Sequence, residues 1–217
     1  MILSKRLEAA LSFLGDCVCL MDVGSDHAYV AIEAVERGIA KRAIAIENKQ
    51  KPFEKSRVNA LASSKASQIE VWLSDGLSKV DPQCDAVTIL GMGGRLIADI
   101  LSGGDLRHIH QLILCPNSES EDTRRFLEEH HFEITQEVAL IDHDKYYQII
   151  KAVPGEMTLT EMERRFGPII LQEKPEAMVR FIGQRIAVLT QAQQHAKTKE
   201  VQTALAEEIA LLKECIQ

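Results

Sequence analysis

The sequence lacks the long apolar segment that marks a membrane or secreted protein. No stretch of its 217 residues approaches the roughly 18 consecutive apolar residues that a membrane-spanning helix needs. Residues 1–14 mix charged with apolar side chains, which is typical of an amphipathic helix and not of a signal peptide. We therefore expect a cytoplasmic protein with no membrane partner.

Cysteine and histidine occur without the spacing of a metal site. The five cysteines form no CxxC pair, and Cys17 and Cys19 lie two apart in an apolar run, on one face of a predicted strand. His130 and His131 are adjacent on a predicted helix and point in different directions. We expect all five cysteines to be reduced, mostly buried thiols, and we expect no metal ion.

Basic charge is not in excess, since the formal net charge is −7. The acidic excess lies in the middle of the chain, where residues 61–150 carry 15 acidic and 7 basic side chains. Residues 1–60 carry 9 basic and 8 acidic side chains, and residues 151–217 carry 9 of each. A nucleic acid would therefore be met at the two ends of the chain, away from the acidic middle.

Short apolar runs alternate with stretches of helical spacing in residues 1–153. The runs are residues 17–23, 43–47, 69–73, 86–90 and 111–115, and the helical stretches are residues 28–38, 50–63, 94–102 and 120–131. Near-continuous apolar strands separated by helices predict a parallel sheet covered on both faces. Residues 132–140 and 146–153 have only a polar turn between them, which predicts an antiparallel hairpin. We therefore expect a Rossmann-like α/β domain with a mostly parallel, seven-stranded sheet.

A second, helical domain is predicted for residues 154–217. Thr158 and Glu161 have the spacing of a capping box at the start of a helix. From residue 175 onward apolar side chains recur every three or four positions, with a polar interruption at residues 191–200. This pattern predicts two amphipathic helices packed as an antiparallel coiled-coil hairpin.

The turn after the first predicted strand combines a glycine with acids. It consists of Gly24, Ser25, Asp26 and His27, and it lacks the GxGxxG glycines of dinucleotide-binding proteins. The carboxylates of Asp22 and Asp26 would repel a pyrophosphate, whereas a ligand with a cationic centre, an amino group or hydroxyls would be favoured. This favours S-adenosylmethionine (SAM) over NAD or ATP, although Asp26 alone is also explained as a helix cap.

Acids also end the second and third strands. Glu47, with Asn48 beside it, is placed to accept both hydroxyls of a ribose. Asp75 and Gly76 follow the third strand, where the carboxylate either accepts a bond from an adenine amino group or only forms a turn. Together with the first turn, these residues predict a nucleoside site at the carboxyl edge of the sheet.

Glycines end the fourth strand, and an asparagine ends the fifth. Gly91, Met92 and Gly93 leave bare backbone at the centre of the ligand edge, where a flat base can approach closely. Asn117 follows a proline, and its amide either bonds a base edge or caps the helix that starts near residue 119. Both features extend the predicted site beyond the cofactor towards a second ligand.

These motifs occur in the order and spacing of one protein family. They are DVGSDHAYV (22–30), Glu47, SDGL (74–77), GMGG (91–94), LILCPN (112–117) and KYYQII (145–150), with LSKRL (3–7) and FGPIILQEK (166–174) at the two ends. The chain resembles the bacterial tRNA (adenine(22)-N1)-methyltransferase family. It departs from the family pattern at Val30-Ala31, where the family has Leu-Pro, at Cys115, where it has Gln, and at Gln148, where it often has an acid.

The resemblance implies a class I SAM-dependent methyltransferase that methylates N1 of an adenine in the D-arm of tRNA. Adenine N1 carries a free lone pair, so positioning rather than a strong base is expected to drive transfer. Asp26, His27 and the backbone of Gly93 are the candidates around the transferred methyl group, and Asn117 and Tyr146 are candidates for holding the base.

Cations on the predicted helices at both ends are the candidates for tRNA contacts. They are Lys5, Arg6, Arg180, Arg185, Lys197 and Lys199. The alternative is that these side chains are simply the solvated faces of their helices. Two other functions stay open from the sequence: a SAM-dependent methyltransferase with another acceptor, and a non-catalytic module that binds SAM or RNA. We expect a monomer or a weak homo-oligomer.

Overall fold

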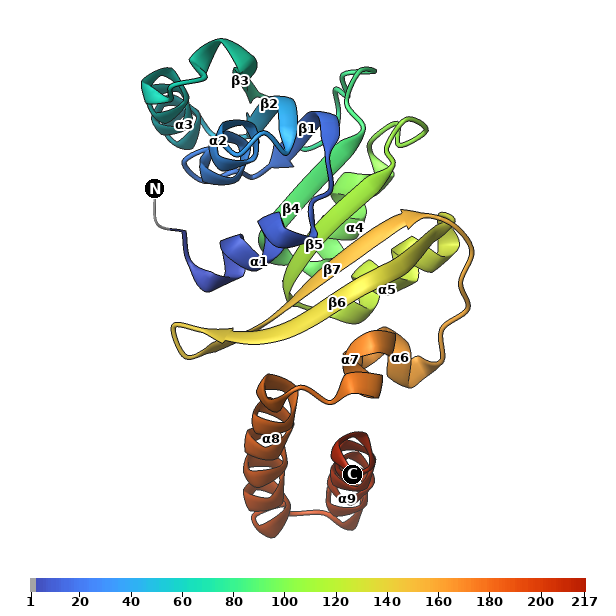
Figure 1. Cartoon of the computed structure of the whole chain (residues 1–217). Helices are drawn as coiled ribbons and strands as arrows, with labels where there is room; N and C mark the ends of the chain where they lie inside the picture. Colours follow the sequence, from blue (N-terminus) through green and yellow to red (C-terminus); the bar gives the residue numbers. More distant parts are fainter. Residues whose placement is uncertain (1–2) are drawn as a thin grey trace.

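A seven-stranded, mostly parallel sheet forms the centre of the protein (Figure 1). The computed structural model describes residues 3–217. The strands are β1 (Cys17–Val23), β2 (Ala40–Glu47), β3 (Ile69–Leu73), β4 (Ala86–Gly93), β5 (Gln111–Ser118), β6 (Phe132–Asp142) and β7 (Lys145–Pro154), in the spatial order β3-β2-β1-β4-β5-β7-β6. Strands β1 to β5 are parallel, and β7 runs antiparallel to both β5 and β6. The predicted Rossmann-like sheet with a closing hairpin is therefore confirmed.

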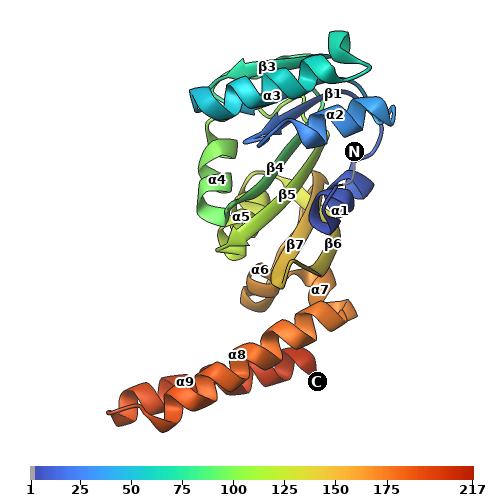
Figure 2. The same cartoon turned by 90° about the vertical axis from the view of Figure 1, so that its left-hand side faces the viewer.

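Helices cover both faces of this sheet (Figure 2). They are α1 (Lys5–Phe13), α2 (Tyr29–Glu36), α3 (Gln50–Ala62), a short 3-10 helix (Ala66–Gln68), α4 (Gly94–Ser102) and α5 (Ser120–Glu129). Helices α1, α2 and α3 share one apolar core with the sheet, and α4 and α5 share another on the opposite face. Burial on both faces explains why the strands are apolar without alternation.

The order of the strands reverses between β1 and β4. The chain passes outward from β1 through β2 to β3, and then crosses back to β4 and β5 on the other side of β1. The carboxyl ends of β1 and β4 therefore flank the switch point where ligands bind in open α/β sheets. All the loops singled out in the sequence meet at this edge.

At the ligand edge of the sheet, β4 and β5 run further than their apolar pattern indicates. β4 continues to Gly93 and β5 to Ser118, each beyond the predicted strand. The pairing of β4 with β5 shifts register around Met92, which is the irregularity expected where glycines replace packed side chains. Asn117 and the backbone of residues 91–93 thus lie on paired strand ends and not in free loops.

Four helices follow the sheet. They are α6 (Glu161–Phe166), α7 (Pro168–Glu173), α8 (Glu176–Gln194) and α9 (Lys199–Ile216). Helices α8 and α9 lie side by side as an antiparallel hairpin, which we call the helical arm (Figures 1 and 2). Their core includes Ala139 of β6 and packs against Tyr146 of β7. The predicted division into residues 1–153 and 154–217 remains a prediction, and the arm shares its core with the sheet hairpin.

The capping box of α6 differs from the predicted one. Thr160, not Thr158, is the N-cap, and its side chain and that of Glu163 exchange hydrogen bonds with each other's backbone. The helix begins at Glu161, so the box lies two residues later than the sequence pattern placed it.

One pair of cysteines also differs from the expectation. Cys19 on β1 and Cys84, just before β4, are joined by a disulfide, whereas Cys17, Cys115 and Cys215 are buried thiols. The two bonded residues are 65 apart in the chain, and only the pairing of β1 with β4 brings their Cα atoms to 4.3 Å. Within residues 3–217 no helix is long and apolar enough to cross a membrane.

Candidate functional site

The loop between β1 and α2 has an uncommon backbone conformation. The φ angles are +66° at Gly24, +37° at Asp26, +82° at His27 and +61° at Ala28. Left-handed conformations cost a residue with a side chain about 1–3 kcal/mol each and cluster at ligand sites. The loop is held by Asn59, whose Nδ2 donates to the carbonyl of His27 at 2.9 Å. This strained turn is the strongest single sign of function at the edge.

Asp22 lies beneath this loop. It is 2% exposed and accepts hydrogen bonds from the hydroxyls of Ser25 and, at 2.7 Å, Thr88. Burial raises the pKa of the Asp22 carboxyl, and these two hydrogen bonds act in the opposite direction. Asp22 therefore supports the loop from within the protein by holding Ser25, and its predicted contact with the cofactor stays a prediction.

Glu47 at the end of β2 is also largely enclosed. Its Oε1 accepts the hydroxyl of Ser56 at 3.0 Å, and the carboxylate also accepts the backbone N–H of Asp26. Burial raises the pKa of the Glu47 carboxyl. Glu47 thus ties the loop after β1 to the end of β2, with Asn48 exposed beside it.

The two residues predicted for the turn after β3, Asp75 and Gly76, differ in exposure. Asp75 is exposed, so its carboxylate is accessible to a ligand. Gly76 is buried with φ +50°, and a Cβ there would lie 3.1 Å from Ile100 Cγ2. Gly76 therefore shapes the turn through its backbone, whereas Asp75 presents an exposed carboxylate.

The ends of β4 and β5 are joined by Asn117. Its Nδ2 donates to the carbonyl of Gly91 at 2.6 Å. The sequence left open whether Asn117 caps α5, but the N-cap of that helix is Glu119, which makes no side-chain cap bond. Gly91 has φ +81°, and Met92 places its methyl group against Gly24, so the loops after β1 and β4 meet.

Arg6 lies at this edge and not on the outer surface. A Cβ on Gly91 would come within 2.5 Å of its Nη1, and its guanidinium stacks 5.1 Å above the ring of Tyr147. Burial raises the pKa of the nearby Cys115 thiol to about 11, and the charge of Arg6 acts in the opposite direction. Arg6, predicted to contact RNA, is therefore partly buried beside Gly91 and Tyr147, and its contact with RNA stays a prediction.

Two cavities lie between the end of β5, the β6–β7 hairpin and α8. Their volumes are about 240 Å³ and about 420 Å³, and both are lined by Asn117, Tyr146 and Phe181. The rings of Tyr146 and Phe181 stack with centroids 4.3 Å apart and planes 11° apart. Phe181 is 39% exposed. The sequence did not single it out, because its spacing on α8 reads as ordinary core.

Basic side chains surround these cavities. Arg165 and Arg185 line the smaller cavity, and Arg180 lines the larger one. Lys197 and Lys199 are exposed at the turn between α8 and α9, and Lys5 is exposed on α1. The predicted RNA contacts on the arm therefore fall into one group at the cavities and another at the tip of the arm.

The fold and the edge define a class of protein. A sheet of this order, with acids, glycines and a strained turn at its switch point, is a Rossmann-like nucleoside-binding fold, and the two cavities lie beside it at the end of β5. In the described part of the chain no three His, Cys, Asp or Glu side chains are grouped to hold a metal ion.

Comparison with known proteins identifies the family of this chain. Residues 20–214 match the model of the tRNA (adenine(22)-N(1))-methyltransferases, and the chain belongs to this family. It is 32% identical over 230 residues to the tRNA (adenine(22)-N(1))-methyltransferase of Bacillus subtilis (strain 168), covering 99% of this chain and 97% of that protein.

A solved structure matches over the whole chain. The structure of Sp1610 from Streptococcus pneumoniae, a proposed tRNA (m1A22) methyltransferase, superimposes with a TM-score of 0.95 at 37% identity, covering 100% of both chains. Its complex with S-adenosyl-L-methionine gives 0.92 at 38% identity, again over 100% of both chains. The family resemblance found in the motifs is thereby confirmed.

Proposed function

We propose that the carboxyl edge of β1 to β4 binds SAM and that the two cavities beside β5 receive the target adenine of a tRNA. The reaction of the family is the SAM-dependent transfer of a methyl group to N1 of adenine 22 in tRNA. One observation supports this assignment above the others. The strained loop after β1 lies against the glycine-rich end of β4, and both lie at the switch point of the sheet.

The residues at this edge fit SAM. The cofactor carries a sulfonium, an ammonium group and a ribose diol, all of which are favoured by acidic and backbone acceptors. Asp26 and Asp75 are exposed there, and the positive φ angles of Gly24 and Gly91 let the loops after β1 and β4 approach each other closely. When bound, SAM supplies an electrophilic methyl group. The candidates for holding it are Asp22, Gly24, Ser25, Asp26, His27, Glu47, Asn48, Asp75, Gly76, Gly91, Met92 and Gly93.

The protein's contribution to transfer is positioning and charge stabilisation. Adenine N1 needs no base, and a nucleophile held in line gains most of its rate from fixed geometry. Methylation makes the base cationic, so the carboxylate of Asp26 and the backbone carbonyl of Gly93 would stabilise the developing charge. His27 stacks on Tyr29 with centroids 5.1 Å apart, which fixes its ring beside Asp26.

Asn117 and Tyr146 hold the base in this proposal. Asn117 donates through Nδ2 to Gly91, which leaves its Oδ1 to accept a bond from the exocyclic amine of adenine. Tyr146 and Phe181 offer aromatic surface to a base that has left its stack. Burial raises the pKa of Tyr146, so it acts as a neutral phenol.

The helical arm and α1 would contact the tRNA backbone through Lys5, Arg180, Arg185, Lys197 and Lys199. Cations that neutralise phosphates strengthen binding without regard to sequence. The combined change Lys197→Glu and Lys199→Glu should weaken tRNA binding measured by filter retention and leave SAM binding intact. Unchanged tRNA affinity would remove the tip of the arm from the footprint. We also propose that the protein acts in the cytoplasm as a monomer or weak homo-oligomer.

Mass mapping of methylated adenines tests the function directly. The enzyme is incubated with SAM and an unmodified tRNA transcript, and with a matched transcript that carries guanine at position 22. We expect N1-methyladenine at position 22 in the first transcript and none in the second, and loss of most turnover in Asp26→Ala and Asn117→Ala. Methylation at another position, of another acceptor, or of nothing at all would contradict the proposal.

A further inference from the structure

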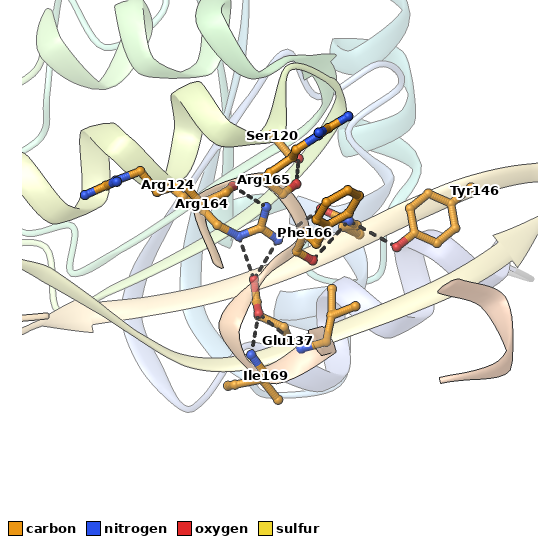
Figure 3. A network of polar contacts seen from close by, with 10 residues as sticks. Ser120, Arg124, Glu137, Tyr146, Arg164, Arg165, Phe166 and Ile169 are labelled. Carbon is orange, nitrogen blue, oxygen red and sulfur yellow. Dashed lines mark hydrogen bonds and ion pairs between the residues drawn. The ribbon is translucent and has the colours of Figure 1, made fainter. Parts of the chain in front are cut away.

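A buried ion pair lies against the turn between α6 and α7 (Figure 3). Arg124 of α5 and Glu137 of β6 both have fully buried side chains. Nε and Nη2 of Arg124 donate to Oε1 of Glu137 at 2.9 and 2.7 Å. Arg124 is the largest fully buried side chain among the described residues.

The pair binds the backbone on both sides of the turn between α6 and α7. Nη1 of Arg124 donates to the carbonyl of Arg164 at 3.2 Å, and Oε2 of Glu137 accepts the N–H of Ile169 at 3.0 Å. Gly167 lies between these contacts with φ +96°, and a Cβ there would come within 2.5 Å of Glu137 and 2.7 Å of Arg124. The turn between α6 and α7 therefore packs directly against the ion pair.

The same network reaches the cavities. Nη2 of Arg124 donates to Oε1 of Gln148 at 2.9 Å, and Nε2 of Gln148 donates to the hydroxyl of Tyr146 at 3.1 Å. The ring of Tyr146 stacks on Phe181 of α8. A continuous chain of contacts thus runs from the turn between α6 and α7, through Arg124 and Gln148, to the aromatic pair that lines both cavities.

Stability alone does not account for such a pair. Removing two charges from water is costly, and well-packed apolar residues of the same volume often stabilise a protein as well or better. A fully hydrogen-bonded polar network does fix one arrangement of the groups it joins, because each alternative leaves a buried donor or acceptor without a partner. Here the groups that it joins are the turn between α6 and α7, which precedes the arm, and Tyr146 in one wall of the cavities.

We propose that Arg124, Glu137 and Gln148 are positioning residues for methyl transfer. The network fixes the hydroxyl of Tyr146, and the Tyr146 ring in turn stacks on Phe181 of α8, so that both rings keep their place in the cavities that Asn117 also lines. Gln148 acts on the reaction through Tyr146, and Arg124 acts through Gln148. The inference rests on the proposed role of the cavities as the site of the target adenine.

The test is a double-mutant cycle on Gln148 and Tyr146. Gln148→Leu removes the link to the hydroxyl, and it should lower kcat for tRNA methylation by about tenfold to a hundredfold, because small displacements of a held reactant cost that much. Its dissociation constant for SAM, measured by calorimetry, should stay unchanged. Tyr146→Phe should lower kcat comparably, and Gln148→Leu in that background should add less than about twofold.

Two further variants separate positioning from general damage. In Gln148→Glu the carboxylate still accepts from Arg124 and can accept from the Tyr146 hydroxyl, so kcat should return to within about threefold of wild type. Gln148→Met, of similar length but with no strong hydrogen-bonding group, should stay low and serves in place of Gln148→Leu if that variant does not fold. Gln68→Leu, an exposed glutamine far along the chain, is the control and should leave kcat unchanged.

The outcomes distinguish this inference from the proposed function. If the wild-type enzyme does not methylate adenine 22, the proposed function fails. If it does, wild-type kcat in Gln148→Leu or Gln148→Met overturns the positioning role. Equal activity of Gln148→Met and Gln148→Glu, or full additivity of Gln148→Leu with Tyr146→Phe, overturns it as well.

Discussion

The two halves of the candidate site are built in different ways. On the cofactor side, neighbouring residues of one short loop adopt left-handed conformations, and buried acids such as Asp22 hold that loop from within. On the target side, Asn117, Tyr146 and Phe181 come from β5, β7 and α8 and meet only through packing and a buried network. The first half depends on local backbone geometry, and the second depends on how the arm is docked.

Breaking the buried pair should have the largest effect on the target side. Arg124→Met leaves Glu137 charged and without its main partner in the interior, and we expect the free energy of unfolding to fall by about 3–5 kcal/mol. Urea denaturation measures this. The matched change Arg107→Met removes an ion pair with Asp105 from a surface position that is 82% exposed, and it should leave stability nearly unchanged. Equal effects of the two variants would contradict the account.

The turn under the arm should not tolerate a side chain. Gly167→Ala places a Cβ at φ +96° against the Arg124–Glu137 pair, and it should destabilise the protein by about 1–3 kcal/mol. Gly183 lies inside α8, and a Cβ there has nothing within 4 Å. Gly183→Ala should therefore stabilise the protein by about 0.5–1 kcal/mol. The melting temperatures of both variants test this prediction. Shifts of the same sign in the two variants would contradict it.

A change confined to the target side should separate the two halves in kinetics. Phe181→Ala removes one ring of the aromatic pair, and kcat/KM for tRNA should fall by about 5-fold to 150-fold, since stacking contributes about 1–3 kcal/mol per base. SAM affinity should not change. Val188→Ala on the same helix, 58% exposed and away from the cavities, should leave both quantities at wild-type values. Weaker SAM binding in Phe181→Ala would show that the halves are not separate.

The smallest effect is expected on the cofactor side, as a dependence on pH. Burial raises the pKa of Asp22 above the ordinary 3.8, so the folded protein holds this proton to a higher pH than the unfolded chain does. The contribution of Asp22 to stability is therefore largest below the unfolded pKa and falls as the pH rises through the folded pKa. Asp22→Asn does not titrate, so its unfolding free energy relative to wild type should increase across that interval. A difference that is constant with pH in urea titrations would rule this out.

The cofactor half was largely predictable from the sequence because its signals are local. Gly24, Asp26 and Glu47 stand at strand ends that the apolar pattern predicts, and parallel strands bring their carboxyl ends to one edge. The sequence did not reveal that Asp22 is buried under the loop or that Gly76 is buried against Ile100. Those roles depend on which neighbour a side chain faces, and a pattern along one strand does not contain that.

The target half was predicted in fewer of its parts. Asn117 and Tyr146 were expected near the base. Phe181 was expected in the core, because the apolar spacing of a helix does not show which of its apolar side chains are exposed. Arg6 read as a surface cation, although packing of α1 places it beside Gly91. Arg124 and Glu137 carried no signal, since they lie 13 positions apart in the chain. Gln148 stood out only as a departure from the family pattern, and its partner Arg124, 24 positions away, did not show in the sequence.

The sequence by itself determined the parallel sheet, its closing hairpin, the two long helices and the family, because periodicity and short motifs are properties of the chain. The tertiary structure decided which side chains face one another at the ligand edge and how the arm packs beside the cavities. The physical reason is that burial, hydrogen-bond partners and pKa values depend on distances between strands and helices, and these distances exist only after packing.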